Sequence, residues 1–473
     1  MEDEKKPEVL STPSMGSVAA EAAMITKYPL KQYWKCLAAC TLMSLCPFQY
    51  GFDFGLIGGL QAMVGFLRIF GYEDANILGG WNISTERQQL ISSLMTLGAF
   101  LSSSMAGPIA GVMSRKTTVW IASVVCIVSN IIMMTTTNIA ALYVGRLLIG
   151  IANGMFMTFS QLYIQFQPTT NREKECSPAR YRGLMISSFQ VWITIGTLVG
   201  TVVDNSTAKI DSPNAYMIPL GLIYIVPVIL SVGLLFIPES PRWLAQHGEP
   251  DKARTALRWH RPGTDIEIDE EMRNIQAALQ SDMAREKTVT FWDMFRNPAD
   301  QRRTLLATGA LALQGSSGAM YMIAPYAWIS GGELPSQRLR SFTFGFATAI
   351  GFFLAWLTTF TTPYFINPQA LNWGPKYGYI WAPSCWISAL WVFFFLPEVK
   401  DRTLEEIDEM VRLPTPENRV CTQPQLTQPS SSTPDFTQDS SENMFAMART
   451  EKRAPGLLAW TTRGTQTSCT KSS

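Results

Sequence analysis

Two ionisable residues of opposite sign lie in otherwise apolar stretches, and their side chains suit proton chemistry. Asp53 lies in the stretch 49–59 and Arg146 in the stretch 143–154. A charge inside a membrane is costly unless it is paired or hydrated, so each residue marks a candidate functional site. An arginine makes a nearby carboxylate more acidic, and loss of that partner makes the carboxylate easier to protonate. The sequence therefore predicts a proton-coupling pair, with a fixed structural salt bridge as the alternative.

The elements that must position these residues are long apolar runs. A membrane-spanning helix needs about 20 mostly apolar residues. Apolar residues make up 47% of the 473 and charged residues only 16%, a balance typical of a polytopic membrane protein. Asp53 and Arg146 are the only strong charges that we expect well inside the first six spans. The predicted spans are 38–66, 89–112, 117–137, 139–163, 184–203, 216–237, 304–332, 342–365 and 377–396.

Basic residues mark the cytoplasmic side of such spans. They precede the first span, separate the second from the third at Arg115 and Lys116, and number eleven in 241–303. Two loops poor in Lys and Arg carry glycosylation acceptor triplets, at Asn82 and Asn205, which only an outer face could use. The amino terminus is therefore predicted to be cytoplasmic. The first run is too long and starts too late for a cleaved signal peptide, so we expect it to remain as an anchor.

The chain is predicted to be all-α and to divide into five segments. A polar cytoplasmic segment, 1–35, precedes a six-span half, 36–240. A cytoplasmic linker, 241–303, should contain surface helices, because 267–279 combines helical spacing with many charges. A shorter membrane segment, 304–412, leads to a tail rich in Ser, Thr, Pro and Gln, 413–473, which is predicted to be disordered.

Composition and motifs argue against several other classes of protein. A net charge of +1 gives no electrostatic case for a nucleic-acid partner. The eight cysteines include no CxxC pair and there are only two histidines, so neither a zinc site nor a disulfide framework is predicted. No nucleophile–base pair, metal cluster or phosphate loop is present, so we predict no enzyme and no cofactor. Free thiols in apolar runs are expected at Cys36, Cys40, Cys46, Cys126 and Cys385.

Several short motifs resemble those of the sugar porter family of the major facilitator superfamily, in the style of the fungal hexose and maltose permeases. The resemblance covers roughly residues 36–412. It implies two six-span halves that rock about a site at the bilayer midplane, here with a complete amino-terminal half and a shortened carboxyl-terminal half. The matching residues are Gly51-Phe-Asp53, Gly145-Arg146 with Gly150, Glu175 to Gly183, Pro238 to Leu244 and Pro397 to Glu406.

The resemblance also implies roles for particular residues. Asp53 matches the position of the carboxylate that becomes protonated in proton-coupled members, and Arg146 matches the position of the arginine that pairs with it. Gln190, Gln314 and Trp328 fall on sugar-binding positions, where amides bond to hydroxyls and an indole packs on the C–H face of the ring. A lone buried glutamine more often makes a hydrogen bond between helices. The assignment of these residues therefore rests on their positions in the family's motifs. Charges at cytoplasmic helix ends, which should hold an outward-open state, are Arg115, Lys116, Glu175, Arg182, Glu239, Arg242, Glu333, Arg338, Glu398 and Arg402.

The sequence departs from the family pattern in four places. Gly111 and Val112 stand where an aspartate and an arginine are usual, which weakens one inner-face contact. Residues 166–174 separate Glu175 from the end of the fourth span, and Met320 replaces a sugar-contacting asparagine. The largest departure is that 307–324 leads directly into a stretch resembling the tenth span. The end of span seven and the spans equivalent to eight and nine are therefore expected to be absent.

Basic residues flank both ends of this fused run, with Arg302 and Arg303 before it and Arg338 and Arg340 after it. The run 304–332 is long for one crossing, which takes about 20 residues, and short for a hairpin, which takes about 40. The positive-inside bias favours a shallow re-entrant loop with a cytoplasmic tail. The alternative is a carboxyl-terminal half that inserts inverted.

The predicted function is proton-coupled symport of a hexose or an alpha-glucoside by alternating access, in the plasma membrane. The predicted partners are the sugar, the proton and the lipid bilayer. Because the carboxyl-terminal half is short, little or no transport is expected from the chain in this form. The alternative function is therefore that of a non-transporting sugar sensor or a defective, shortened paralogue.

Overall fold

A computed structural model of the chain describes residues 34–395, except for 75–79, 166–178, 211, 261–262, 286–289, 317–326, 329, 333, 337–338 and 368–369. Side chains are described over the same residues, apart from 165, 179–187, 278 and 281–285. The predicted segment 1–35 therefore lies outside the described residues except at its end. The predicted tail 413–473 lies outside them entirely.

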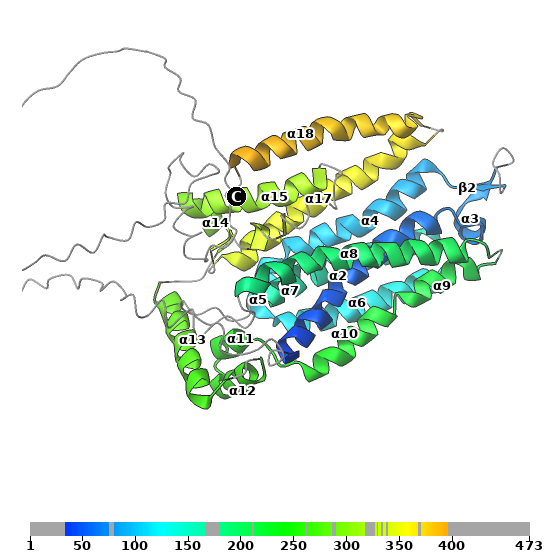
Figure 1. Ribbon diagram of the computed structural model, residues 1–473. Helices are drawn as coiled ribbons and strands as arrows, with labels where there is room; N and C mark the ends of the chain where they lie inside the picture. The colour runs from blue at the N-terminus through cyan, green and yellow to red at the C-terminus, as the bar shows by residue number, and fades with distance from the viewer. Residues whose placement is uncertain are drawn as a thin grey trace, which may run out of the picture. The chain divides into compact units, whose positions relative to one another are not determined.

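The described chain is almost wholly α-helical, which confirms the predicted fold class (Figure 1). A short antiparallel pair of strands, β1 (Tyr72–Glu73) and β2 (Trp81–Asn82), is the one sheet found in the described residues. The helices that cover the predicted amino-terminal half are α2 (Trp34–Leu60), α3 (Val64–Phe70), α4 (Thr85–Ser104), α5 (Ala106–Val112), α6 (Arg115–Thr135), α7 (Ile139–Gln165), α8 (Ala179–Thr207), α9 (Asn214–Leu222) and α10 (Ile225–Phe236).

Hydropathy supports most of the predicted spans. Within the described residues, five helices are long and apolar enough to cross a membrane, or up to seven if two bent pairs each count as one span. The predicted span 184–203 lies within α8, and the start of the predicted span 304–332 lies within α15 (Pro298–Ser316). Neither helix is among those seven, and residues 317–326 of the second span lie outside the described residues. The helices among the five are Arg115–Thr135, Ile139–Ile164, Asn214–Phe236, Arg340–Ile366 and Gly374–Phe395.

Two of the predicted spans, 38–66 and 89–112, each correspond to a bent pair of helices. The helix pair α2 and α3 turns by 77°, and the pair α4 and α5 turns by 50°. Pro108 has no backbone N–H to donate to the carbonyl four residues earlier, at Ser104, which is where α4 ends. Gly58 and Gly59 lie just before the first bend, where two glycines weaken a helix.

Glycines bring α2 and α8 into close contact. A Cβ added to Gly55 would lie 2.6 Å from the Thr197 carbonyl oxygen, and one added to Gly200 would lie 2.6 Å from the Phe52 carbonyl oxygen. Small residues allow such close approach between helices in lipid, where packing rather than the hydrophobic effect drives association. The same arrangement, through Gly150, brings α7 against Met95 of α4.

The described part of the linker forms four helices, which range from 4 to 21 residues. The predicted helix 267–279 lies within α13, and Leu257, Ile268 and Ile275 form a small buried cluster between α12 and α13. Arg254 donates two hydrogen bonds to the carboxylate of Asp269 across the same pair of helices. The linker helices are α11 (Pro241–Gln246), α12 (Pro250–His260), α13 (Asp265–Arg285) and α14 (Asp293–Arg296).

In the carboxyl-terminal half, α15 and α17 (Arg340–Ile366) run parallel (Figure 1). A Cβ on Gly351 would meet Leu311, and one on Gly315 would meet Leu354 and Ala355. By Gly331 the chain has returned to the level of Leu311, because a Cβ there would lie 3.0 Å from Leu311 Cδ1. The two helices thus begin on the same side, as a re-entrant connection requires, and α15 reaches the middle of α17. Residues 317–326 of that connection lie outside the described residues, so its path and its shallow depth stay predictions.

The last described helix, α18 (Gly378–Phe395), has few neighbours. Within Gly374–Phe395, only 6% of the most apolar 18-residue stretch is buried. It contacts α15 where Ser384 Oγ donates to the Ser316 carbonyl at 2.6 Å and where the Trp391 ring lies against Gly309. Its contact with α17 runs through the turn η2 (Gly374–Tyr377), where the Tyr377 and Thr362 hydroxyls lie 3.0 Å apart. This exposure is what a half-domain without its full set of helices would show.

The packing of α2 against α8 predicts opposite outcomes for two glycines of α2. Gly55→Ala forces a methyl group against the Thr197 carbonyl and should destabilise the protein by about 1–3 kcal/mol. Gly58→Ala places its methyl where nothing lies within 4 Å and should leave stability unchanged or raise it. Thermal unfolding of the purified proteins in detergent measures both effects. Equal losses from the two substitutions would contradict this packing.

The parallel course of α15 and α17 predicts where the end of the chain lies. With Asn82 and Asn205 replaced by Gln, an acceptor triplet inserted between 367 and 373 should become glycosylated in a eukaryotic host. A triplet added after Ser473 should stay unmodified, because α18 returns the chain to the side on which α15 begins. Electrophoretic mobility with and without glycosidase reports both. A modified carboxyl-terminal triplet would overturn the re-entrant arrangement.

Candidate functional site: a buried ion pair and a cavity between the two halves

Asp53 of α2 and Arg146 of α7 form a buried ion pair. Nη1 of Arg146 lies 3.3 Å from Oδ1 of Asp53, and the two side chains are 2% and 0% exposed respectively. Burial removes both charges from water, a cost that their attraction offsets only when the geometry is good and further hydrogen bonds are made. The structure therefore brings together the two residues predicted as the proton-coupling pair.

A third residue completes this pair. Asn153 of α7 donates from Nδ2 to Oδ2 of Asp53 at 2.8 Å, so each carboxylate oxygen has its own donor. Asn153 follows Arg146 by seven residues, which is about two helical turns and places both on one face of α7. The sequence analysis missed Asn153, although its spacing from Arg146 was a usable signal.

A second buried carboxylate lies nearby. Asp204 of α8 is 5% exposed, so a buried charge that the sequence analysis did not predict lies one residue beyond the predicted span 184–203. The predicted span ended at residue 203, whereas α8 continues as helix to Thr207 and so keeps Asp204 within the bundle. Arg146 lies within electrostatic reach of both carboxylates.

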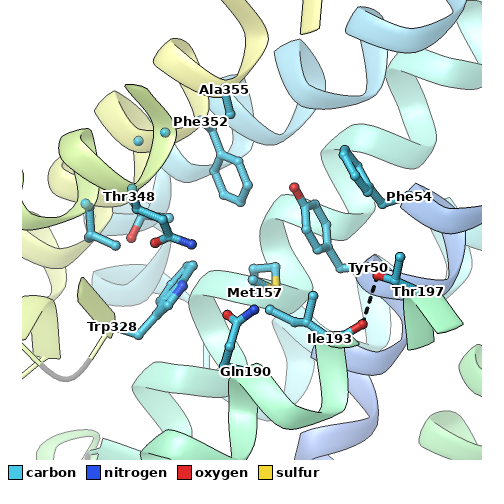
Figure 2. A pocket seen from close by; sticks show the side chains of 14 residues that line it. Tyr50, Phe54, Met157, Gln190, Ile193, Thr197, Trp328, Thr348, Phe352 and Ala355 are labelled. Carbon is cyan, nitrogen blue, oxygen red and sulfur yellow. Dashed lines mark hydrogen bonds between the residues drawn. The ribbon is translucent and has the colours of Figure 1, made fainter. Parts of the chain in front are cut away.

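A cavity between the helices of the two halves is lined by all three residues predicted to bind sugar. Figure 2 shows Gln190, Trp328, Tyr50 and Phe352 directed toward a common space. Its free volume is about 50 Å³, enough for a few water molecules at roughly 10–15 Å³ each. The lining residues are Tyr50, Phe54, Met157, Gln190, Ile193 and Thr197 from the amino-terminal half, with Leu311, Gln314, Gly315, Trp328, Thr348, Gly351, Phe352 and Ala355 from the other.

Three polar atoms of this lining have no hydrogen-bond partner among the described residues. They are Oε1 of Gln190, Nε1 of Trp328 and Oγ1 of Thr348. Buried polar groups are nearly always satisfied in folded proteins, so an unsatisfied group in a cavity indicates a site for water or a polar ligand. The indole of Trp328 is held in place by Phe189 and Phe344, whose ring centroids lie 5.1 and 5.8 Å from its own. A fixed aromatic face thus lies beside free donors and acceptors.

Part of the predicted inner-face network is visible. Lys116 Nζ donates to the Ile237 carbonyl at 2.8 Å, and Arg115 lies within electrostatic reach of Glu239 and Arg242. These contacts link the start of α6 to the chain that follows α10. The space around Gly111, where the family usually places an aspartate, holds no atom within 4 Å of an added Cβ.

The other residues predicted for this network, and some of the departures, lie outside the described residues. Arg182 belongs to α8, but its side chain is not described. The remaining positions without a described placement are Glu175, Glu333, Arg338, Glu398, Arg402, Met320 and the insertion 166–174.

Comparisons with known proteins identify the family. The family model described as "Sugar (and other) transporter" matches residues 39–324 and 321–411, and the junction falls in the region predicted to lack spans. The transporter ecdD of Aspergillus rugulosus, described as major facilitator-type, is 22% identical over 80% of this chain and 87% of its own length. The glucose transporter GlcP of Staphylococcus epidermidis is 32% identical over 49% of this chain and 47% of its own. The chain thus spans about half the length of several curated relatives it matches.

The fold has a solved counterpart. An inward-open structure of the xylose transporter XylE from E. coli matches with a TM-score of 0.54 at 18% identity, over 79% of this chain and 99% of that one. This likeness shows the helical fold that the chain shares with that protein. By the family model, the chain belongs to the sugar porter family of the major facilitator superfamily and is an integral, multi-pass membrane protein. The relatives named above are transporters, not enzymes.

The buried ion pair predicts strong coupling between its two members. Arg146→Gln leaves the Asp53 carboxylate buried without its cation and should destabilise the protein by about 3–5 kcal/mol. Combining it with Asp53→Asn removes both charges and should recover most of that loss. Thermal unfolding of the single and double variants measures the coupling. Simple addition of the two single effects would show that the residues act independently.

Proposed function

We propose that this chain binds a hexose or an alpha-glucoside in the cavity between its halves and moves it with a proton by alternating access. The observation that carries the proposal is the convergence of Gln190, Gln314 and Trp328 on one cavity from three separate segments of the chain. Amides both donate to and accept from sugar hydroxyls, while an indole face packs on the C–H face of the ring. Partner-free polar atoms at Gln190 and Trp328 are available for this.

The small free volume supports a conformational cycle. A sugar ring is larger than the few water molecules that the cavity now accommodates, so Trp328 and Phe352 on one wall must separate from Tyr50 on the other. Tyr50 and Phe352 lie across the cavity with ring centroids 5.9 Å apart. Rocking of the two halves would open this contact. We further propose that Arg115, Lys116, Glu239 and Arg242 brace the cytoplasmic ends in one state of the cycle.

The ion pair supplies the proposed proton coupling. Protonation of Asp53 would remove the charge that holds Arg146 and so weaken the link between α2 and α7. Both helices also line the cavity, through Tyr50 and Met157. A change at the ion pair is therefore transmitted along the same helices that would contact the sugar.

A second candidate function is sugar sensing without transport. It is favoured by the sparse packing of α18 and by the parallel course of α15 and α17, both of which are expected of a carboxyl-terminal half that lacks some of its helices. A sensor would bind sugar in the same cavity and report it, without a complete cycle. For either function, we propose the plasma membrane, with 36–240 and 304–412 as the two membrane halves, 241–303 as a cytoplasmic linker and 413–473 as a cytoplasmic tail.

Binding measurements test the proposed cavity. In the purified chain, radiolabelled glucose or maltose should bind saturably in equilibrium dialysis. Gln190→Ala should weaken binding by about 1–3 kcal/mol, the range for stranding a buried hydrogen-bonding partner. Gln276→Ala, at an exposed position of α13, serves as the matched control and should leave affinity unchanged. Sugar affinity unchanged by substitution of Gln190, Gln314 and Trp328 in turn would refute the assignment.

Counterflow of radiolabelled sugar in proteoliposomes separates the two candidate functions. Saturable exchange that requires Gln190 supports a transporter. Binding at the cavity without exchange supports a sensor, and absence of both would contradict a sugar site altogether.

A further inference from the structure

Asp204 is buried at a helix contact that makes room for its carboxylate. It is 5% exposed on α8 and lies against the backbone amide of Gly59 on α2. A Cβ on Gly59 would overlap the carboxylate, so the absence of a side chain there leaves its space open. No side chain of the described residues donates a hydrogen bond to Asp204.

The negative and positive charges around Asp204 are unequal in number. From α2 it faces Asp53, six residues before Gly59 and so about 9 Å away along the helix axis. From α7 it faces Arg146, and the one titratable side chain of α9 is Tyr216. With all groups ionised, this buried cluster of described residues would hold two carboxylates and one guanidinium. An uncompensated buried charge is costly, so the cluster should bind one extra proton.

Hydrogen bonding decides which carboxylate holds that proton. Asp53 accepts from Arg146 at 3.3 Å and from Asn153 at 2.8 Å, and both donors favour its ionised form. Asp204 has no comparable side-chain donor. The neutral acid is therefore less costly at Asp204 than at Asp53.

We propose that Asp204 holds a proton in this conformation and is the outer acceptor that passes it to Asp53. The inference rests on the proposed proton coupling. Asp204 lies where α2 and α8 end, at the end of the bundle predicted to face outward, and Asp53 lies deeper along α2. Water molecules relay the proton over this distance: the O–H bond of Asp204 breaks, each water accepts one proton and gives up another, and an O–H bond forms on Asp53. Arg146 then follows the negative charge from Asp53 to Asp204, so protons and charges are conserved.

Infrared spectroscopy of the full chain in lipid nanodiscs tests this without sugar or transport. The parent should show the carbonyl stretch of a protonated, buried carboxylic acid at neutral pH. Asp204→Asn should abolish the band, whereas the exposed control Asp251→Asn should leave it unchanged. Asp204→Glu should keep the band at a shifted frequency, while Asp53→Glu should leave its frequency unaltered.

A band that persists in Asp204→Asn, or one that shifts in Asp53→Glu but not in Asp204→Glu, would overturn the proposal. The two glutamate variants, Asp204→Glu and Asp53→Glu, still assign the band if Asp204→Asn fails to fold. This result can be told apart from a failure of the proposed function. If the band is assigned to Asp204 but the chain binds no sugar, the protonation of Asp204 is supported and the proposed sugar binding is refuted.

Discussion

The buried contact of Asp53 with Arg146 and Asn153 is the interaction on which the rest of the structure depends. Two charges inside a bilayer are tolerable only if α2 and α7 remain adjacent and in a fixed register. Glycines pack each of these two helices against a further neighbour: Gly55 and Gly200 let α2 and α8 approach closely, and Gly150 does the same for α7 and α4. The ion pair thus joins α2 to α7, while the glycine contacts hold α2 against α8 and α7 against α4.

The shortened carboxyl-terminal half forms the cavity with fewer elements than two six-span halves would offer. One helix, α17, packs along α4, from Gly345 near Ser103 at one end to Asn367 near Gln88 at the other. Trp328 adds an aromatic side chain to the same cavity, and Phe189 of α8 packs against it. The described part of this half thus supplies lining residues from α15, Trp328 and α17, whereas α18 is nearly uncovered.

The sequence predicted the helical class and most span positions, because a bilayer demands long apolar helices and little else. It did not predict the bends, which depend on a missing N–H at Pro108 and on paired glycines. Asn153 and Asp204 were missed for a related reason, since whether a polar residue at a helix face or end is buried depends on its neighbours. The cavity residues Gln190, Gln314 and Trp328 were predictable only through the family resemblance, as isolated amides carry no functional signal.

The central claim is that proton and sugar binding are linked through Asp53 and the cavity. Linkage is reciprocal, so sugar binding must change the number of bound protons. Calorimetric titration of glucose or maltose into the purified chain, in buffers that differ in ionisation enthalpy, measures that number. The account predicts a buffer-dependent heat for the parent and a buffer-independent heat for Asp53→Asn. The same heat in every buffer for the parent, or undiminished proton exchange in Asp53→Asn, would contradict it.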